Sequence, residues 1–370
     1  MNDFGGKNYG EYFKALEEQL NKVEADTCGN NAENEPRVNA KRRNGVYKTV
    51  RLRKSVIVAF AAVVVLAIGL AVKDFSKPAE AKPQPEVGKT QATEQKQENV
   101  SKISYSFGKD TPDILADNDA ECAIIINKTD NKVVAARNAH KRVYPASTTK
   151  IMTVLVAAEN ITDMNDTFTM TYAITDPLFV AGASAAGFSN GEAVTMTDLL
   201  YGAVLPSGAD ATMGLAVKLA GSEEAFVKLM NQKVKELGLK NTNFTNVSGL
   251  HNKENYCSAY DMAVILDAAM QNEVCKKVLS TYQYTTAVTP QHPEGILLSS
   301  TLFNYMYGTE PETATILGGK TGFVNESGYC IASFGKANAT ENEYIVVTMG
   351  NSARKPAFYG QIELYKEFAK

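Results

Sequence analysis

Two side chains with complementary chemistry stand three residues apart in the segment PASTTKIMT, Pro145–Thr153. Ser147 carries a hydroxyl that becomes a nucleophile once a base removes its proton, and the amine of a desolvated Lys150 can be that base. Apolar and small residues follow at helical spacing, and residues three apart on a helix lie on one face, about 5–6 Å apart. The spacing predicts that the Lys150 amine reaches the Ser147 oxygen. By itself, however, Ser-x-x-Lys is more typical of a helix start with a surface lysine.

Two further short motifs lie downstream of this pair. PSGADA, Pro206–Ala211, follows an apolar helical segment, and GGKTG, Gly318–Gly322, precedes a strand-like segment. Both also have ordinary interpretations, because Pro-Ser-Gly favours a turn and paired glycines suit a bend. A phosphate-binding loop is disfavoured, since its pattern needs glycine where the chain has Ala314, and a helix after the lysine.

In this order and at wide spacing, the three motifs resemble the signature set of penicillin-interacting serine acyl-transferases. From about Ile103 to Asn351 the chain is similar to the D-alanyl-D-alanine carboxypeptidases, the low-molecular-mass penicillin-binding proteins. The blocks that carry this resemblance are RVYPASTTKIMT, LLYGAVLPSGADA, ELGLKNTNFTNVSGLHNKENYCSAYDMA and GGKTGFVNESGYC. The resemblance implies a serine peptidase that removes the terminal D-alanine from peptidoglycan stem pentapeptides and binds β-lactam antibiotics covalently.

The resemblance assigns the bond-breaking steps to three side chains. Ser147 would attack the carbonyl carbon between the two D-alanines, and Lys150 would take its proton. An amine can do this near pH 7 only if burial and a second cation lower its pKa, and Lys320 would supply that cation. Ser207 would relay the proton to the departing D-alanine nitrogen. Water then hydrolyses the acyl-enzyme, so neither a metal ion nor an organic cofactor is implied.

The third motif would bind the substrate. Lys320 and Thr321 would hold its terminal carboxylate, and Gly322 would let the peptide pass close to the strand. The backbone N–H groups of Ser147 and Phe323 would form the oxyanion hole, in which one donor typically contributes about 3–4 kcal/mol.

A terminal carboxylate also attracts arginine, and the region after residue 102 has three arginines: Arg137, Arg142 and Arg354. Arg354 follows the last predicted strand, so it would lie near the substrate if that strand pairs with the Lys320 strand. A surface arginine is the alternative interpretation.

The second motif departs from the family pattern at its third position, where asparagine is usual and this chain has Ala209. The asparagine amide normally bridges the active-site lysine and the substrate backbone, and a methyl group forms no hydrogen bond. Loss of one such contact would cost about 1–3 kcal/mol, or about 10–100-fold in rate. A catalytically weak or silent module that senses β-lactams or the wall is therefore one alternative function.

A serine β-lactamase is a second alternative, since it shares the fold and the first chemical steps. One major class hydrolyses its acyl-enzyme with a glutamate in a Glu-x-x-Leu-Asn element. The nearest segment, Glu236–Lys240, lacks the asparagine and fits better as the end of a helix closed by Gly238. This departure disfavours the β-lactamase interpretation.

Strands near both ends of the outer region, with helices between them, must position these motifs. Ala123–Asn127 and Lys132–Ala136 predict a hairpin, and Gly328–Phe334 with Tyr344–Met349 predict late strands. We expect an α+β domain of the β-lactamase/DD-peptidase-like type over residues 103–370. In it, helices would flank an antiparallel sheet built from both chain ends.

The N-terminal third has a different character. Residues 1–54 are polar and predict a mostly disordered cytoplasmic segment. Val56–Val72 is an apolar run of 17 residues, preceded by eight Lys or Arg residues between Arg37 and Lys54. These features predict a single-pass transmembrane helix over residues 55–72 with its N-terminus in the cytoplasm. Residues 73–102 would then form an extracytoplasmic linker from the bacterial membrane to the catalytic domain; cleavage near Ala79–Ala81 is the alternative.

The composition of the chain argues against some other classes of protein. The chain has 370 residues, 44% of them hydrophobic, and a net charge of −3, which gives no indication of a nucleic-acid partner. Its five cysteines form no close-spaced pair and its three histidines are scattered, so a structural zinc site is disfavoured. We expect buried thiols, with one disulfide among the last four cysteines as the alternative. The oligomeric state is not indicated by the sequence.

Overall fold

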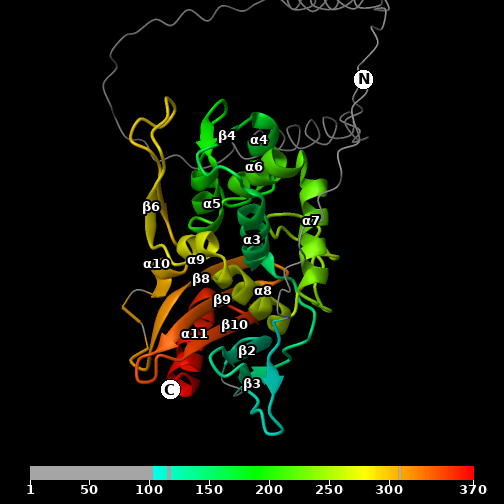
Figure 1. The fold of residues 1–370 in the computed structure, drawn as a ribbon, viewed down its shortest axis with the longest axis vertical. Helices are drawn as coiled ribbons and strands as arrows, with labels where there is room; N and C mark the ends of the chain where they lie inside the picture. Colours follow the sequence, from blue (N-terminus) through cyan, green and yellow to red (C-terminus); the bar gives the residue numbers. More distant parts are fainter. Residues whose placement is uncertain (1–102, 115–117, 307, 310) are drawn as a thin grey trace, which may run out of the picture. The chain divides into compact units, whose positions relative to one another are not determined.

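The computed structural model describes residues 103–114, 118–306, 308–309 and 311–370 (Figure 1). The chain divides into two units, Met1–Thr93 and Glu94–Lys370, and the described residues all belong to the second. Within them, no helix has the length and apolar character needed to span a membrane. The predicted cytoplasmic segment, transmembrane helix and linker fall on residues 1–102, outside the described residues.

The main sheet combines strands from both ends of the described region, as predicted. Its order is β1-β3-β2-β10-β9-β8, so the two C-terminal strands β9 and β10 lie between β8 and the β2–β3 hairpin. Neighbours from β3 to β8 are antiparallel, but β1 pairs with β3 in parallel, and the expectation of a wholly antiparallel sheet is wrong at this edge. The strands are β1 Ser106–Phe107, β2 Cys122–Asn127, β3 Lys132–Arg137, β8 Ala314–Val324, β9 Gly328–Ala337 and β10 Glu343–Asn351.

Helices fill the chain between the two groups of strands, and a last helix follows them. Two small two-stranded sheets, β4–β5 and β6–β7, accompany the helical part. The bounds are η1 Ala146–Thr149, α3 Lys150–Asn160, β4 Thr167–Thr169, α4 Tyr172–Val180, β5 Ala193–Thr195, α5 Met196–Val204, α6 Ala209–Ala220, α7 Glu223–Glu236, α8 Ala259–Gln271, α9 Glu273–Leu279, β6 Gln283–Thr285, β7 Leu297–Ser299, α10 Phe303–Met306 and α11 Arg354–Phe368.

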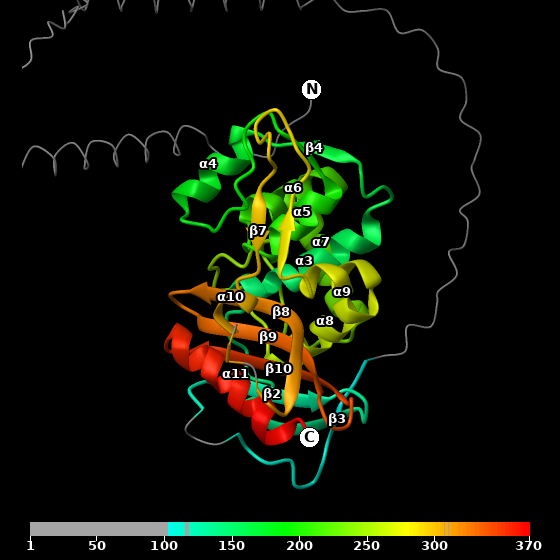
Figure 2. The same ribbon diagram turned by 90° about the vertical axis from the view of Figure 1, so that its left-hand side faces the viewer.

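Helices cover both faces of the sheet, which explains why every residue of β2 is buried. Successive side chains of a strand point to opposite faces. Accordingly, Ile124 and Ile126 join a large core with α3 and α8, whereas Ala123 and Ile125 join a smaller core with α11. Figure 2 shows α11 along one face of the sheet and α8 toward the helical part. The described domain is therefore α+β.

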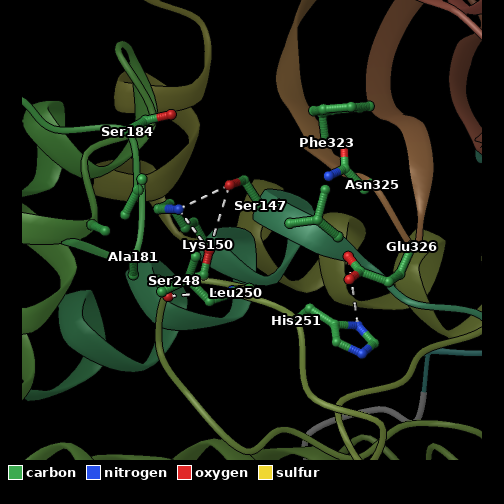
Figure 3. A pocket seen from close by; sticks show the side chains of 15 residues that line it. Ser147, Lys150, Ala181, Ser184, Ser248, Leu250, His251, Phe323, Asn325 and Glu326 are labelled. Carbon is green, nitrogen blue, oxygen red and sulfur yellow. Dashed lines mark hydrogen bonds and ion pairs between the residues drawn. The ribbon is translucent and has the colours of Figure 1, made fainter. Parts of the chain in front are cut away.

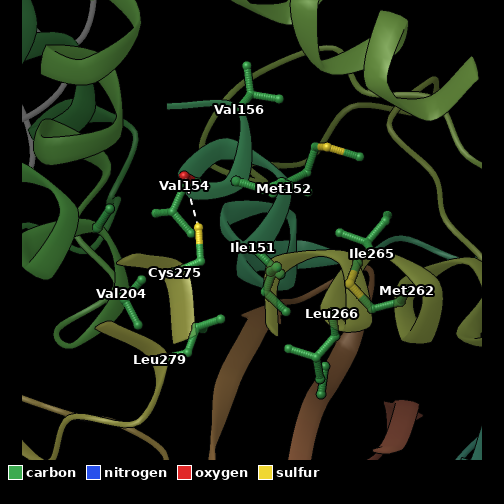
Figure 4. Packing of buried hydrophobic residues seen from close by; sticks show 14 of the residues in the cluster. Ile151, Met152, Val154, Val156, Val204, Met262, Ile265, Leu266, Cys275 and Leu279 are labelled. Carbon is green, nitrogen blue, oxygen red and sulfur yellow. Dashed lines mark hydrogen bonds between the residues drawn. The ribbon is translucent and has the colours of Figure 1, made fainter. Parts of the chain in front are cut away.

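Helix α3 is the centre of the larger core. All its residues from Lys150 to Ala157 are buried, and Ile151, Met152 and Val154 pack among side chains of α5, α8 and α9 (Figure 4). Close packing on every side leaves the first turn of this helix little freedom to move. Cys275 is part of this packing, and all four described cysteines are buried and free, as expected for small hydrophobic residues.

Candidate active site

Ser147 lies in the short η1 turn that runs directly into α3 at Lys150. Lys150 Nζ is 3.0 Å from Ser147 Oγ (Figure 3), the contact that the three-residue spacing predicts. The residue before Ser147, Ala146, has a φ of +46°, which non-glycine residues rarely adopt. Gly249 packs against this peptide so closely that a Cβ there would lie 1.8 Å from Ala146 O. A distant loop thus packs against the strained peptide that precedes Ser147.

That loop also supplies a partner for the lysine. Lys150 Nζ donates a hydrogen bond of 2.6 Å to the carbonyl oxygen of Ser248, which lies 98 residues further along the chain. Asn246 fixes the loop, because its Oδ1 accepts the Gly249 N–H at 2.7 Å, and Thr153 Oγ1 on α3 donates to Val247 O. We did not predict a role for Ser248. The only indication of one was that Ser248 lies within ELGLKNTNFTNVSGLHNKENYCSAYDMA, a block that resembles the family.

The surroundings of Lys150 favour its neutral form. Burial lowers the pKa of Lys150 to about 7, because an ammonium group loses its hydration there; the carboxylate of Asp210 opposes this effect. The pKa of Lys320 also lies well below its usual value, first through burial and then through repulsion by Lys150. We had expected the Lys320 charge to act on Lys150 together with burial; burial is the principal cause at both sites.

Strand β8 brings the third motif against Ser147. Lys320 is 1% exposed and its Nζ donates to Thr321 O at 2.8 Å. A Cβ at Gly322 would lie 2.9 Å from Ser147 N and 3.1 Å from Pro145 O. Glycine is therefore required at position 322 because the backbones of β8 and η1 approach each other there. From the sequence, we expected a different reason for this glycine, namely that it lets the substrate pass close to the strand. Phe323 is 48% exposed and stacks on Tyr329, with ring centroids 4.3 Å apart.

A second threonine accompanies the motif threonine. Thr321 Oγ1 and Thr301 Oγ1 lie 2.7 Å apart, and the Thr301 N–H donates to Leu205 O just before the second motif. Thr301 thus links β8 to the end of α5. No sequence pattern singles out Thr301, because a lone threonine before a short helix is common.

The second motif forms the junction between α5 and α6. Ser207 is buried and has a φ of +67°, a second left-handed non-glycine residue at this site. Ala209 is the first residue of α6, and its N–H donates to Ser184 O at 2.7 Å. Asp210 accepts the N–H groups of Ala186 and Gly187, so it fastens the loop after α4 to the start of α6.

Arg354 was expected near the substrate on the condition that the last strand pairs with the Lys320 strand. That pairing is absent, because β9 lies between β10 and β8, but the Arg354 guanidinium lies 5.8 Å from the ring centroid of Tyr329, which stacks on Phe323. A carboxylate-binding role for Arg354 stays a prediction. Arg354 is the first residue of α11; its Nη1 donates to Tyr305 Oη at 2.5 Å and its guanidinium lies 4.6 Å from the Tyr305 ring centroid. It lines a separate hollow with Tyr305 and α11 residues.

A cavity of about 520 Å³ opens onto Ser147 and Lys150. Residues 181–184 and Ala209 form part of its wall, and residues 248–251 and 323–326 form the rest (Figure 3). The described part of the chain has no cluster of His, Cys, Asp or Glu that could hold a metal ion. A serine beside a buried amine of low pKa, next to a cavity of this size, is the arrangement of a nucleophilic acyl-transfer enzyme.

The comparison with protein families agrees with this class. The family model of D-alanyl-D-alanine carboxypeptidases, peptidase family S11, matches residues 108–353. The chain belongs to this family.

Two related proteins support the same family assignment. The chain is 33% identical over 256 residues to the D-alanyl-D-alanine carboxypeptidase DacF of Bacillus subtilis, covering 69% of this chain and 63% of that protein. It is also 33% identical over 241 residues to DacA of Escherichia coli, covering 62% and 55%. The chain thus spans somewhat over half the length of these relatives.

Solved structures resemble the described domain. The crystal structure of a Streptomyces DD-transpeptidase matches with a TM-score of 0.61 and 27% identity, covering 67% of this chain and 97% of that one. Penicillin binding protein 5 of Haemophilus influenzae matches with a TM-score of 0.57 and 27% identity, covering 67% and 69%. These matches agree with the predicted DD-peptidase-like fold.

Proposed function

We propose that the protein is a serine-type D-alanyl-D-alanine carboxypeptidase that removes the terminal D-alanine from peptidoglycan stem pentapeptides through an acyl-enzyme on Ser147. The observation that carries this proposal is the 3.0 Å contact between Ser147 Oγ and Lys150 Nζ, whose pKa is lowered to about 7. Near neutral pH a large fraction of Lys150 is then the free amine, able to accept the serine proton. The family assignment supports the same reaction.

The remaining motif residues receive the roles that the family resemblance implies for them. Ser207 passes the proton to the departing D-alanine nitrogen, so that the amine leaves as a neutral group. Lys320 and Thr321 bind the terminal carboxylate. The N–H groups of Ser147 and Phe323 stabilise the oxyanion, a role supported by the close approach of β8 to the Ser147 backbone at Gly322. β-Lactams would acylate the same serine and act as covalent inhibitors.

The location of the enzyme is proposed from the sequence alone. A transmembrane helix over residues 55–72, built on the apolar run Val56–Val72 behind a basic segment, would anchor the chain in the bacterial membrane, with residues 1–54 in the cytoplasm. Residues 73–102 would link this anchor to the catalytic domain outside the membrane, where peptidoglycan is found.

Two assays on the full chain in detergent test the function. The first is covalent labelling of Ser147 by fluorescent penicillin, with Ser147→Ala as the control. The second is release of D-alanine from a stem pentapeptide. We expect labelling and release by the native protein and neither by Ser147→Ala.

Other results would favour the other functions. Absence of labelling would refute every acyl-enzyme function for this chain. Labelling without release of D-alanine would favour a β-lactam or wall sensor, and rapid loss of the label would favour a β-lactamase.

A further inference from the structure

The hydroxyl of Thr321 lies beside the cavity and depends on one neighbour. Thr321 is partly exposed on β8, two residues before Phe323, so both side chains leave the strand on the same face, and Phe323 lines the cavity. Lys320, in contrast, is almost fully buried and its Nζ donates to Thr321 O. Among the described residues, the only hydrogen-bond partner of Thr321 Oγ1 is Thr301 Oγ1, at 2.7 Å. The orientation of the Thr321 hydroxyl therefore depends on Thr301.

The backbone around Thr301 is anchored on several sides. The Thr301 N–H donates to Leu205 O at 3.0 Å, directly after α5 and before the second motif. The two neighbours of Thr301, Ser300 and Leu302, are both buried. The Ser300 N–H donates to Tyr282 O at 2.8 Å, and Leu302 packs in the smaller core. Thr301 therefore presents its hydroxyl to Thr321 from a fixed position.

The hydrogen bond between the two hydroxyls can run in either direction, because each of them can donate. A bound carboxylate decides the direction, since an ionised carboxylate only accepts hydrogen bonds. If Thr321 donates its proton to the carboxylate, then its oxygen is free to accept the proton of Thr301. Successive hydrogen bonds of this kind polarise and strengthen one another. Without Thr301, the Thr321 hydroxyl would rotate more freely and would lose more entropy when a ligand binds.

We propose that Thr301 is a positioning residue for carboxylate recognition: it donates to Thr321 Oγ1 and thereby directs the Thr321 proton at the terminal carboxylate of the substrate. This inference rests on the proposed function, which places that carboxylate at Lys320 and Thr321. Thr301 acts through Thr321 and takes no part in bond breaking. Its effect should therefore be confined to ligands that carry the carboxylate.

Two peptides that differ only in this group test the proposal. One is a stem pentapeptide with a free terminal carboxylate, and the other is its C-terminal amide, which lacks the charge. The measured quantity is the ratio of their kcat/KM values for release of D-alanine and of D-alaninamide by the full chain in detergent. We expect the native protein to prefer the carboxylate by about 10–100-fold, the range of a hydrogen bond to a charged group. Partial unfolding lowers both rates equally and leaves this ratio unchanged.

Substitutions then locate the effect. Thr301→Val keeps the shape of the side chain without its hydroxyl and should lower the preference for the carboxylate by about 3–10-fold, with little change in the rate for the amide. Thr301→Ser retains a hydroxyl and should keep the native ratio. Thr315→Val is the matched control on the same strand, because Thr315 is exposed, does not line the cavity and donates to Asn338 Oδ1 at 2.9 Å. It should also keep the native ratio.

The outcomes separate this inference from the proposed function. If Thr301→Val keeps the native ratio, or if Thr301→Ser lowers it as much as Thr301→Val does, the role of Thr301 is refuted and the carboxypeptidase stands. An equal fall of both rates in Thr301→Val would also refute it, because the effect would then be one of general structure. If the native protein hydrolyses neither peptide, the proposed function fails, and this inference fails with it.

Discussion

The pH dependence of acylation tests the assignment of Lys150 as the base. The pKa of Lys150 is lowered from 10.5 to about 7 by burial, and only the neutral amine can accept the Ser147 proton. At pH 7 about 50% of such a lysine is neutral, against about 0.03% of an ordinary one. This roughly 1,600-fold difference corresponds to about 4 kcal/mol at about 1.36 kcal/mol for each factor of ten.

The direction of the pH dependence follows from the charge of the base. Acylation should be slow at low pH, where Lys150 is protonated, and should rise to a plateau above about pH 8. At pH 5.5 the rate should be about 30-fold below the plateau. The assay is the rate of labelling by fluorescent penicillin between pH 5.5 and 9. The midpoint of this rate-versus-pH curve reflects the coupled titration of Lys150 and Lys320, not that of Lys150 alone.

Asp210→Asn provides an internal check on this reasoning. The Asp210 carboxylate raises the pKa of Lys150, so removal of its charge should move the midpoint to lower pH, while the amide oxygen can still accept a backbone N–H. A rate that does not change between pH 5.5 and 9, a midpoint above pH 9, or an alkaline shift in Asp210→Asn would refute the assignment of Lys150.

Two further substitutions test the packing of Gly249 against Ala146 and the effect of the amide that is missing at Ala209. Gly249→Ala should destabilise the protein by about 3 kcal/mol or more in chemical denaturation, because its Cβ would overlap Ala146 O. Gly221→Ala, at a similar φ of +81° with no atom within 4 Å, should cost only about 1–2 kcal/mol, and equal losses would contradict the steric explanation. Ala209→Asn should raise D-alanine release by about 10–100-fold through the restored amide. Ala209→Leu, of similar size but without an amide, should not; an unchanged rate in Ala209→Asn would refute our explanation of this departure.

Much of the fold could be predicted because it depends on local patterns. The β2–β3 hairpin and the late strands follow from short apolar runs between turn residues, and their ends lie within three residues of the predicted ones. The parallel pairing of β1 with β3 could not be predicted in this way, since β1 is only two residues long and both of them are exposed. Such a segment carries no periodicity that identifies a strand or its partner.

The sequence by itself determined the Ser147–Lys150 pair, because helical geometry fixes the distance between residues three apart. It also determined the family, through several motifs in a fixed order. Contacts between distant segments were decided only by the tertiary structure. The Ser248 carbonyl at Lys150, the Thr301 hydroxyl at Thr321 and the Gly249 contact with Ala146 all depend on how loops far apart in the chain pack together. Arg354 illustrates the same limit, because its position depends on the order of strands in the sheet, which spacing along the chain does not encode.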